Sequence, residues 1–251
     1  MELARPIVLS IAGFDPSGGA GILADIKTFE QHKVYGLGVS TAQTLQTEEV
    51  FYTIKWEDKS NIITALKTML SAYDIKCIKI GIVEDMECLD NIVDVIHRYN
   101  KEIKIVIDTI FTSSTGFKFR EQATDREKML HCFSKAYLIT PNYEEVLLLM
   151  PSENAKVAAK ELSKFTNVLL KGGHNMLEEG TDYLYSGKEV IKINSREANV
   201  APKHGSGCVL SSAITAQLAL GKDLLTACVN AKEYITSFLE SNTSKLGYHY
   251  V

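Results

Sequence analysis

Short aliphatic segments alternate with longer amphipathic segments, and this alternation constrains the fold more than any other feature of the sequence. The aliphatic segments contain few polar residues, which is typical of strands covered on both faces of a parallel sheet. We expect strands at 7–12, 34–41, 77–82, 103–107, 136–139 and 168–170. We expect helices at 21–32, 60–72, 88–99, 126–133, 143–150, 155–165, 208–220 and 222–239. This order predicts an α/β fold with a central, mainly parallel sheet, helices on both of its faces, and small hairpins or flaps at 49–55 and 182–193.

The composition indicates one globular domain over residues 1–251. The net charge of −4 disfavours a nucleic-acid partner, because nucleic-acid-binding domains usually carry a basic face. No apolar run approaches the roughly 20 residues that a membrane helix needs, so we expect no membrane segment. The five cysteines form an odd set without a Cys-x-x-Cys pair, which disfavours disulfides and a structural zinc site. We therefore expect a cytoplasmic protein.

Polar residues follow most of the predicted strands. Ligands of such sheets bind beyond the carboxyl ends of the strands, so these residues are candidates for a common site. They are the loop 13–19, Gln43 and Gln46, Asp108, the run 140–142 with Glu145 one helical turn later, and Lys171.

The segment 203–208 reads Lys-His-Gly-Ser-Gly-Cys and directly precedes a predicted helix. Gly205 and Gly207 allow a close backbone turn, Ser206 lies between them, and the helix start offers unpaired N–H groups to an anion. Cys208 lies at this helix start, where we expect a lowered thiol pKa. The alternative is an ordinary Gly-Ser-Gly loop followed by a buried cysteine.

Together these residues could transfer a phosphoryl group. With the terminal phosphates of a nucleoside triphosphate over the 205–208 loop, Asp108 and Glu145 are the carboxylates best placed to hold Mg²⁺, and Lys171 can neutralise phosphate charge. Cys208 is where the acceptor hydroxyl would approach, so it could serve as a base or as a positioning group.

Each candidate also has a purely structural explanation. Asp108 could cap the following turn, Lys171 could be a surface lysine, and Glu145 could be a first-turn helix acid with Asn142 as the helix cap. His174 and His204 are more often loop hydrogen-bonders than catalysts. Asp25 lies inside an apolar helical run and needs a partner, for which a ligand is one option.

Two glycine spacings suggest other nucleotide-binding proteins but lack a required feature. Residues 19–24 match the dinucleotide-binding fingerprint, but about six residues separate them from the strand end. Residues 13–18 have the spacing of a P-loop, but Gly19 and Ala20 stand where Lys and Ser or Thr are required.

Four motifs resemble a known family. The run Gly-Phe-Asp-Pro-Ser-Gly-Gly-Ala-Gly at 13–21, within the longer match 11–29, is similar to the opening signature of the hydroxymethylpyrimidine/phosphomethylpyrimidine kinases of thiamine biosynthesis. The segments 140–145, 171–174 and 204–208 resemble that family in the same order. The resemblance implies a ribokinase-like fold and transfer of the γ-phosphoryl group of ATP to a hydroxymethyl group.

The resemblance also implies roles for single residues. Asn142 with Glu145 would organise Mg²⁺ and phosphate, Asp108 matches an acid of the family, and Lys171 matches a lysine near the nucleotide. Gly205, Ser206 and Gly207 would form the anion hole with Cys208, which takes the place of the aspartate base of the related sugar kinases. Gly13, Asp25 and Gln46 would lie on the pyrimidine side of the pocket.

Gln46 decides the expected substrate. Its carboxamide offers one acceptor and two donors, which complement an aminopyrimidine edge. The pyridoxal or pyridoxine kinases of the same type tend to carry methionine there, and they are the first alternative. A ligand-binding relative that has lost turnover is the remote one. Relatives are commonly dimers, so a homodimer is possible, with the 49–55 hairpin as a candidate flap or interface.

The chain departs from the family pattern after Asp108. Thr109 replaces the usual proline, Phe111 replaces a methionine, and Phe117 stands where an acid is usual. These changes bear most on the second phosphorylation, that of the monophosphate. Ser206 replaces a threonine and keeps the hydroxyl.

Overall fold

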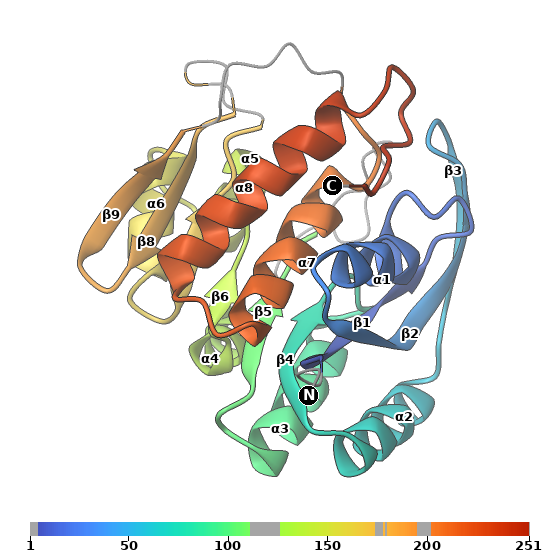
Figure 1. The fold of residues 1–251 in the computed structure, drawn as a ribbon. Coiled ribbons are helices and arrows are strands. Elements are labelled where there is room, and N and C mark those ends of the chain that lie inside the picture. Colours follow the sequence, from blue (N-terminus) through green and yellow to red (C-terminus); the bar gives the residue numbers. More distant parts are fainter. Residues whose placement is uncertain (1–4, 111–125, 174–177, 179, 195–201, 251) are drawn as a thin grey trace.

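A nine-stranded sheet runs through the computed structural model, which describes residues 5–110, 126–173, 178, 180–194 and 202–250 (Figure 1). The strands are β1 (Ile7–Phe14), β2 (Tyr35–Gln46), β3 (Phe51–Trp56), β4 (Ile75–Ile80), β5 (Lys104–Ile107), β6 (Leu138–Ile139), β7 (Asn167–Leu170), β8 (Asp182–Ser186) and β9 (Glu189–Ile193). The helices are α1 (Gly21–Gln31), α2 (Lys59–Ala72), α3 (Met86–Tyr99), α4 (Arg126–Lys135), α5 (Tyr143–Leu149), α6 (Ala155–Leu162), α7 (Ser206–Ala219) and α8 (Leu224–Glu240).

The sheet has the order β3-β2-β1-β4-β5-β6-β7-β8-β9. The six central strands pair in parallel, in the order β2, β1, β4, β5, β6 and β7. Strand β3 at one edge, and β8 and β9 at the other, pair antiparallel. The predicted α/β fold is therefore confirmed, and the two predicted hairpins extend the parallel sheet at its two edges.

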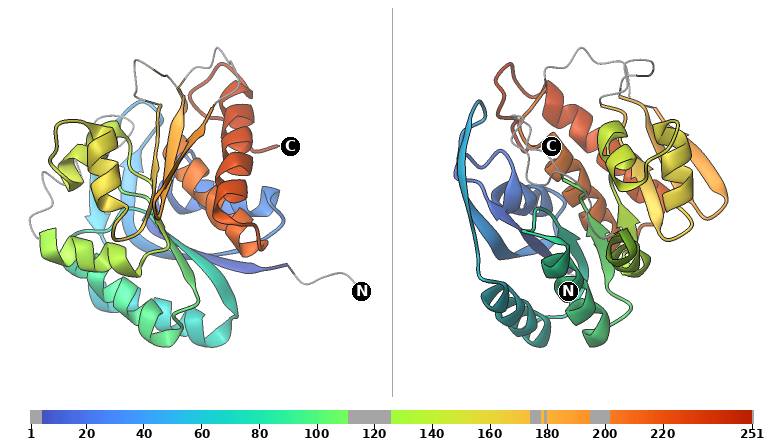
Figure 2. Two further views of the ribbon diagram at one scale, coloured as in Figure 1. Left: turned by 90° about the vertical axis from the view of Figure 1, so that its left-hand side faces the viewer. Right: turned by 180° about the vertical axis from the view of Figure 1, so that it is seen from behind.

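Helices cover both faces of the sheet (Figure 2). Helices α1, α7 and α8 enclose one apolar core, and α2 to α6 enclose the other. Helix α7 is buried along most of its length, which agrees with its apolar sequence and its place between α1 and α8. Among the described residues, no helix combines the length and the apolar character that crossing a membrane requires.

Two boundaries differ from the sequence prediction in ways that matter for the site. We expected Gln43 and Gln46 to follow the second strand, but β2 continues to Gln46 because β3 pairs with its last five residues. Alternation then leaves Gln43 exposed and buries Gln46. Helix α7 begins at Ser206 rather than at Cys208, so Gly207 and Cys208 lie in its first turn.

Candidate active site

The two glycine-rich loops of the sequence pack directly against each other. Gly205, the N-cap of α7, has φ +74°, and a Cβ on it would lie 2.0 Å from the backbone oxygen of Gly19. Only glycine allows this contact and this conformation together. His204 Nε2 lies 2.8 Å from the Asp15 carboxylate, so the structural explanation of His204 holds. The opening motif and the 203–208 loop therefore form one unit.

The N-terminus of α7 is the part of this unit that could bind an anion. Gly205, Ser206 and Gly207 are partly exposed, and helix N-terminal N–H groups are available to a bound anion. A Cβ on Gly207 would lie 3.4 Å from Lys171 Nζ, so an ammonium group lies beside the same turn. Backbone donors and a cation together suit a phosphate group.

The thiol pKa of Cys208 differs from the one that the sequence predicts. The side chain is buried, at 8% exposure, and the Gly21 N–H donates to its sulfur. Burial raises the pKa of Cys208 to about 11, although Lys79 acts in the opposite direction. The expected lowering of the thiol pKa was wrong, because burial outweighs the helix terminus. Cys208 is therefore a neutral thiol at neutral pH.

Five charged groups of alternating sign form a row at the carboxyl ends of the strands: the buried Asp25, Lys79, Asp108 and Glu145, and Lys171, whose side chain is 14% exposed. Lys79 pairs with Asp25 at 2.9 Å, and Lys171 lies 3.0 Å from Asp108 and 3.8 Å from Glu145. The three members on or just after strands lie two positions beyond Cys77, Val106 and Leu169, which belong to the core under α7. Residues two apart in a strand lie on the same face of the sheet, so the row continues that face at the carboxyl ends of the strands.

Asp108 is part of this row, and within the described residues its carboxylate bonds to side chains of other elements. It accepts hydrogen bonds from Lys171 at 3.0 Å, Thr140 at 3.1 Å and Ser211 of α7 at 3.2 Å. Burial would raise the pKa of Asp108, but Lys171 and Lys79 hold it below its usual range. Asp108 is thus an ionised carboxylate in a buried place, and Lys171, which pairs with it and is 14% exposed, is not an ordinary surface lysine.

Glu145 combines its structural explanation with a place in the site. Asn142 caps α5 by accepting from the Glu144 and Glu145 N–H groups, and the Glu145 carboxylate accepts from the Asn142 N–H at 2.8 Å. Burial raises the pKa of Glu145 to about 7, with Lys171 acting against it and Asp108 adding to it. The capping box fixes the position of the Glu145 carboxyl beside Lys171. With this pKa, the carboxyl is close to half-protonated at neutral pH.

Asp25 has protein partners, and one of them was missed in the sequence. Its carboxylate accepts from Lys79, Ser10 and Ser212, so its burial needs no ligand. Lys79 was not among the predicted site residues, because it lies within an apolar run. A lysine in a strand that is buried on both faces is nevertheless unusual. Gly13 is also enclosed by protein, since a Cβ there would lie 2.6 Å from the Ile82 side chain.

Gln46 carries a buried acceptor without a partner. Its Nε2 donates to Thr44 Oγ1 at 2.9 Å, and Thr44 Oγ1 itself donates to the Phe14 carbonyl at 3.0 Å. Because the hydroxyl proton is already used, Thr44 can only accept from Gln46, which fixes the orientation of the amide. Gln46 Oε1 is then one of two buried side-chain polar atoms, with His32 Nε2, that lack a hydrogen bond in the described part of the chain. Such an atom indicates a missing donor.

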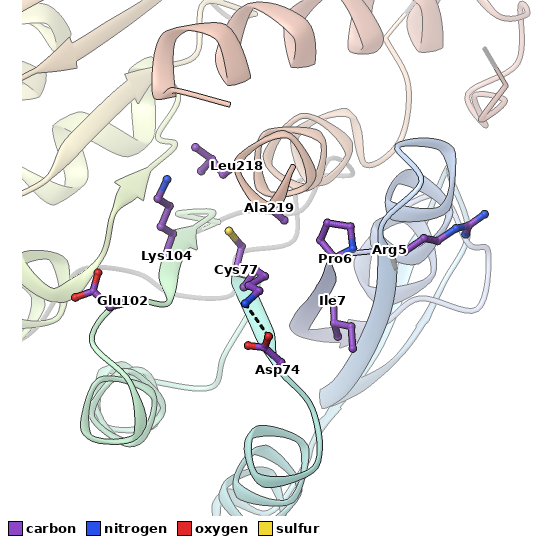
Figure 3. A pocket seen from close by; sticks show the side chains of 10 residues that line it. Arg5, Pro6, Ile7, Asp74, Cys77, Glu102, Lys104, Leu218 and Ala219 are labelled. Carbon is purple, nitrogen blue, oxygen red and sulfur yellow. Dashed lines mark hydrogen bonds and ion pairs between the residues drawn. The ribbon is translucent and has the colours of Figure 1, made fainter. Parts of the chain in front are cut away.

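A cavity of about 510 Å³ lies elsewhere, at the amino ends of β1, β4 and β5 (Figure 3). Its lining includes Ile7, Cys77 and Lys104 together with Ala219 from the last turn of α7. The row of charges and the N-terminus of α7 are at the opposite edge of the sheet. We therefore assign the active site to the carboxyl edge, where parallel sheets bind their ligands.

Comparison with known proteins agrees with this geometry. The sequence profile of the phosphomethylpyrimidine kinase family matches residues 15–251. The chain belongs to this family. The hydroxymethylpyrimidine/phosphomethylpyrimidine kinase of Aquifex aeolicus (strain VF5) is 34% identical over 251 residues, which cover 97% of this chain and 98% of that relative. The predicted family and a phosphotransferase activity are thus confirmed.

Solved structures confirm the ribokinase-like fold of the family. The phosphomethylpyrimidine kinase of Clostridium difficile 630 has a TM-score of 0.77 at 31% identity, covering 93% of this chain and 99% of that one. The pyridoxal kinase of Staphylococcus aureus in complex with AMP-PCP and pyridoxal has a TM-score of 0.83 at 26% identity, covering 97% and 92%. Use of ATP therefore fits the family. Of the residues singled out in the sequence, Phe111, Phe117 and His174 lie outside the described residues.

Proposed function

We propose that this enzyme transfers the γ-phosphoryl group of ATP to 4-amino-5-hydroxymethyl-2-methylpyrimidine and then to its monophosphate, in thiamine biosynthesis. Membership of the family and the Aquifex relative support the reaction. The unpartnered Oε1 of Gln46 carries the choice of substrate. A 4-amino group can donate to it, whereas the ring of pyridoxal has no amino group to offer.

On the nucleotide side, the first turn of α7 binds the transferred phosphate. Phosphoryl transfer needs positioning and charge stabilisation more than covalent help from the protein. The N–H groups of Gly205 and Gly207 supply fixed donors, and Lys171 supplies a cation from the adjacent strand end. Lys171 is 14% exposed, so its ammonium can turn from Asp108 toward an incoming phosphate.

Asp108 and Glu145 fit a magnesium site. Both are buried carboxylates, and both lie close to the Lys171 ammonium, so two acids converge on one position of positive charge. Oxygen ligands of this kind suit Mg²⁺, which binds through one or two carboxylates and substrate phosphates. When bound, Mg²⁺ would neutralise phosphate charge. Asn142 fixes the backbone of Glu145 through the capping box.

On the acceptor side, Gln46 and Cys208 bind different parts of the substrate. Gln46 orients the ring, and Cys208 holds the hydroxymethyl oxygen beside the first turn of α7. A neutral thiol can donate or accept a weak hydrogen bond, so Cys208 acts here as a positioning group. Gly13 and Asp25 are both enclosed by protein groups, so they support this side of the site without contacting the substrate directly.

Pyridoxal is the second candidate substrate, because the Staphylococcus aureus relative is a pyridoxal kinase. ADP release with MgATP and either hydroxymethylpyrimidine or pyridoxal tests the proposal directly. We expect the larger kcat/KM with the pyrimidine. Faster turnover of pyridoxal would reverse the substrate choice, and tight binding of either compound without turnover would indicate a non-catalytic relative.

The Gln46→Met variant should lose the pyrimidine preference. Methionine removes the free acceptor, and a site built to pair a substrate N–H discriminates strongly when the pair is absent. We expect kcat/KM for hydroxymethylpyrimidine to fall about 10²-fold, with a smaller loss for pyridoxal. Steady-state kinetics with both substrates measure the ratio. Equal losses on both would mean that Gln46 does not read the ring.

We also propose a cytoplasmic homodimer. All five cysteines are free, which suits a reducing compartment. Strand β3 is an edge strand, and Leu45, Val50 and Tyr52 on this hairpin are exposed, as expected of a surface that a second copy covers. The Tyr52→Asp variant should then sediment as a monomer under conditions in which the wild type sediments as a dimer. A monomeric wild type would contradict the proposal.

A further inference from the structure

Lys79 is a fully buried cation to which the proposed function gives no task. It is the penultimate residue of β4, and its side chain has no exposed surface. Its Nζ donates to both carboxylate oxygens of Asp25, at 3.0 and 2.9 Å. Burying a charged pair is costly even when it is well bonded, so a simple apolar pair would serve the fold at least as well.

The partner of Lys79 is held as tightly as Lys79 itself. Asp25 on α1 also accepts from Ser10 of β1 at 2.5 Å and from Ser212 of α7 at 2.7 Å. The pair thus joins two strands and two helices, and neither partner reaches solvent. Lys79 cannot leave this position during a catalytic cycle.

Lys79 lies beneath the face of α7 that carries the Cys208 thiol. Cys208, Ser211 and Ser212 are spaced i, i+3 and i+4, so they share one side of the helix. Ser211 donates to Asp108 and Ser212 donates to Asp25, and these are the two acids whose charges act on Lys79. Among the charged groups that act on Cys208, Lys79 is the strongest, and Asp108 and Asp25 oppose it.

The two lysines of the row differ in their freedom to move, because Lys79 is fully buried and Lys171 is 14% exposed. Lys171 lies beside Gly207 and can exchange Asp108 for a phosphate group. When it does so, Asp108 and Asp25 keep only Lys79 as a nearby cation of the row. Lys79 therefore supplies the charge that stays in place while the others rearrange.

We propose that Lys79 is a positioning residue for the phosphoryl transfer. As a permanent counter-ion it fixes Asp25, which accepts from Ser212 of α7, and through Asp25 it holds Cys208 beside the anion site. The proposal rests on the proposed function for its kinetic readout. The chemical reactivity of Cys208 gives a second readout that needs no turnover.

The test compares Lys79→Met with a variant that also carries Asp25→Asn. Methionine keeps the length of the lysine side chain and removes its charge. The Asp25 carboxylate is then buried without its counter-ion, and Asp25→Asn removes that negative charge. We therefore expect the double variant to fold even if the single one does not. Lys135→Met is the control, because Lys135 of α4 forms a partly buried pair with Asp94 of α3, away from the site. Each protein is assayed for kcat, KM for ATP, melting temperature and the rate of Cys208 alkylation by iodoacetamide at pH 8.

We expect both Lys79 variants to lose about 10²-fold in kcat, with a KM for ATP within about threefold of the wild type. Alkylation of Cys208 should slow about tenfold, because removing a nearby cation raises the thiol pKa. Lys135→Met should keep the wild-type kcat and alkylation rate.

Two results would overturn the proposal. One is a kcat within about threefold of the wild type in either folded Lys79 variant. The other is a lost kcat with unchanged alkylation of Cys208, since the residue would then contribute only to folding. If the wild type itself shows no turnover, the proposed function fails, and the alkylation rates alone then decide whether Lys79 acts on the thiol.

Discussion

The Cys208→Ala variant is expected to lose about 10²-fold in kcat while its KM for ATP stays close to the wild-type value. Alanine removes the sulfur that receives the Gly21 N–H and that lies at the first turn of α7. The acceptor hydroxyl then loses its fixed position relative to the phosphate, and small misplacements of reacting groups are costly. In the proposed function, the nucleotide is bound by Lys171 and by backbone groups, which the substitution leaves unchanged.

The pH dependence separates positioning by Cys208 from base catalysis. Because burial raises the pKa of Cys208 to about 11, the thiol stays protonated from pH 7 to pH 9. A thiolate base would make kcat rise about tenfold per pH unit over this range, whereas a positioning group gives no such rise. Serine also donates and accepts a hydrogen bond, so we expect Cys208→Ser to recover most of the rate that alanine loses.

Steady-state kinetics of the two Cys208 variants check this expectation, and Cys228→Ala serves as the control. Cys228 is a buried cysteine of α8, in the core behind α7, and its loss should leave kcat unchanged. A Cys208→Ala enzyme with full kcat would return Cys208 to the role of a core residue. A steep rise of the wild-type kcat with pH would assign it the role of base.

The strand-end rule predicted much of the candidate site from the sequence. Asp108 and Lys171 follow different strands, yet parallel pairing brings them within 3.0 Å of each other. Glu145 joined them because the Asn142 cap sets its direction, a feature that is also visible in the sequence. Such features are predictable because they depend on local order along the chain and on the common edge of parallel strands.

Features that depend on burial could not be predicted in this way. The local rule for a cysteine at a helix start predicts a lowered pKa, but the core around Cys208 reverses the shift. Lys79 is one polar residue in an apolar run, and only the structure shows its partner, 54 positions away in the chain. The free acceptor of Gln46 likewise depends on Thr44 and Phe14, which meet it only after β1 and β2 pair.

The Gly205→Ala variant is expected to lose about 10²- to 10³-fold in kcat, the cost of removing a fixed anion-hole donor. At φ +74° an added Cβ is strained by about 1–2 kcal/mol. It would also lie 2.0 Å from the Gly19 oxygen and 2.7 Å from the Gly19 carbonyl carbon, both backbone atoms that cannot rotate away. The loop must therefore move away from the opening motif, and the N–H groups of the first turn of α7 move with it.

The chain provides a matched control for Gly205 just beyond the other end of the same helix. Gly221 has φ +82°, so alanine there meets the same kind of backbone strain, but no atom lies within 4 Å of the added Cβ. Gly221→Ala should lower the melting temperature slightly and leave kcat unchanged, whereas Gly205→Ala should lose kcat at temperatures well below its own melting point. Steady-state kinetics and thermal unfolding of both variants separate strain from misplacement of the anion site. Equal kcat values for the two variants would show that the contact between Gly205 and Gly19 does not position the transferred phosphate.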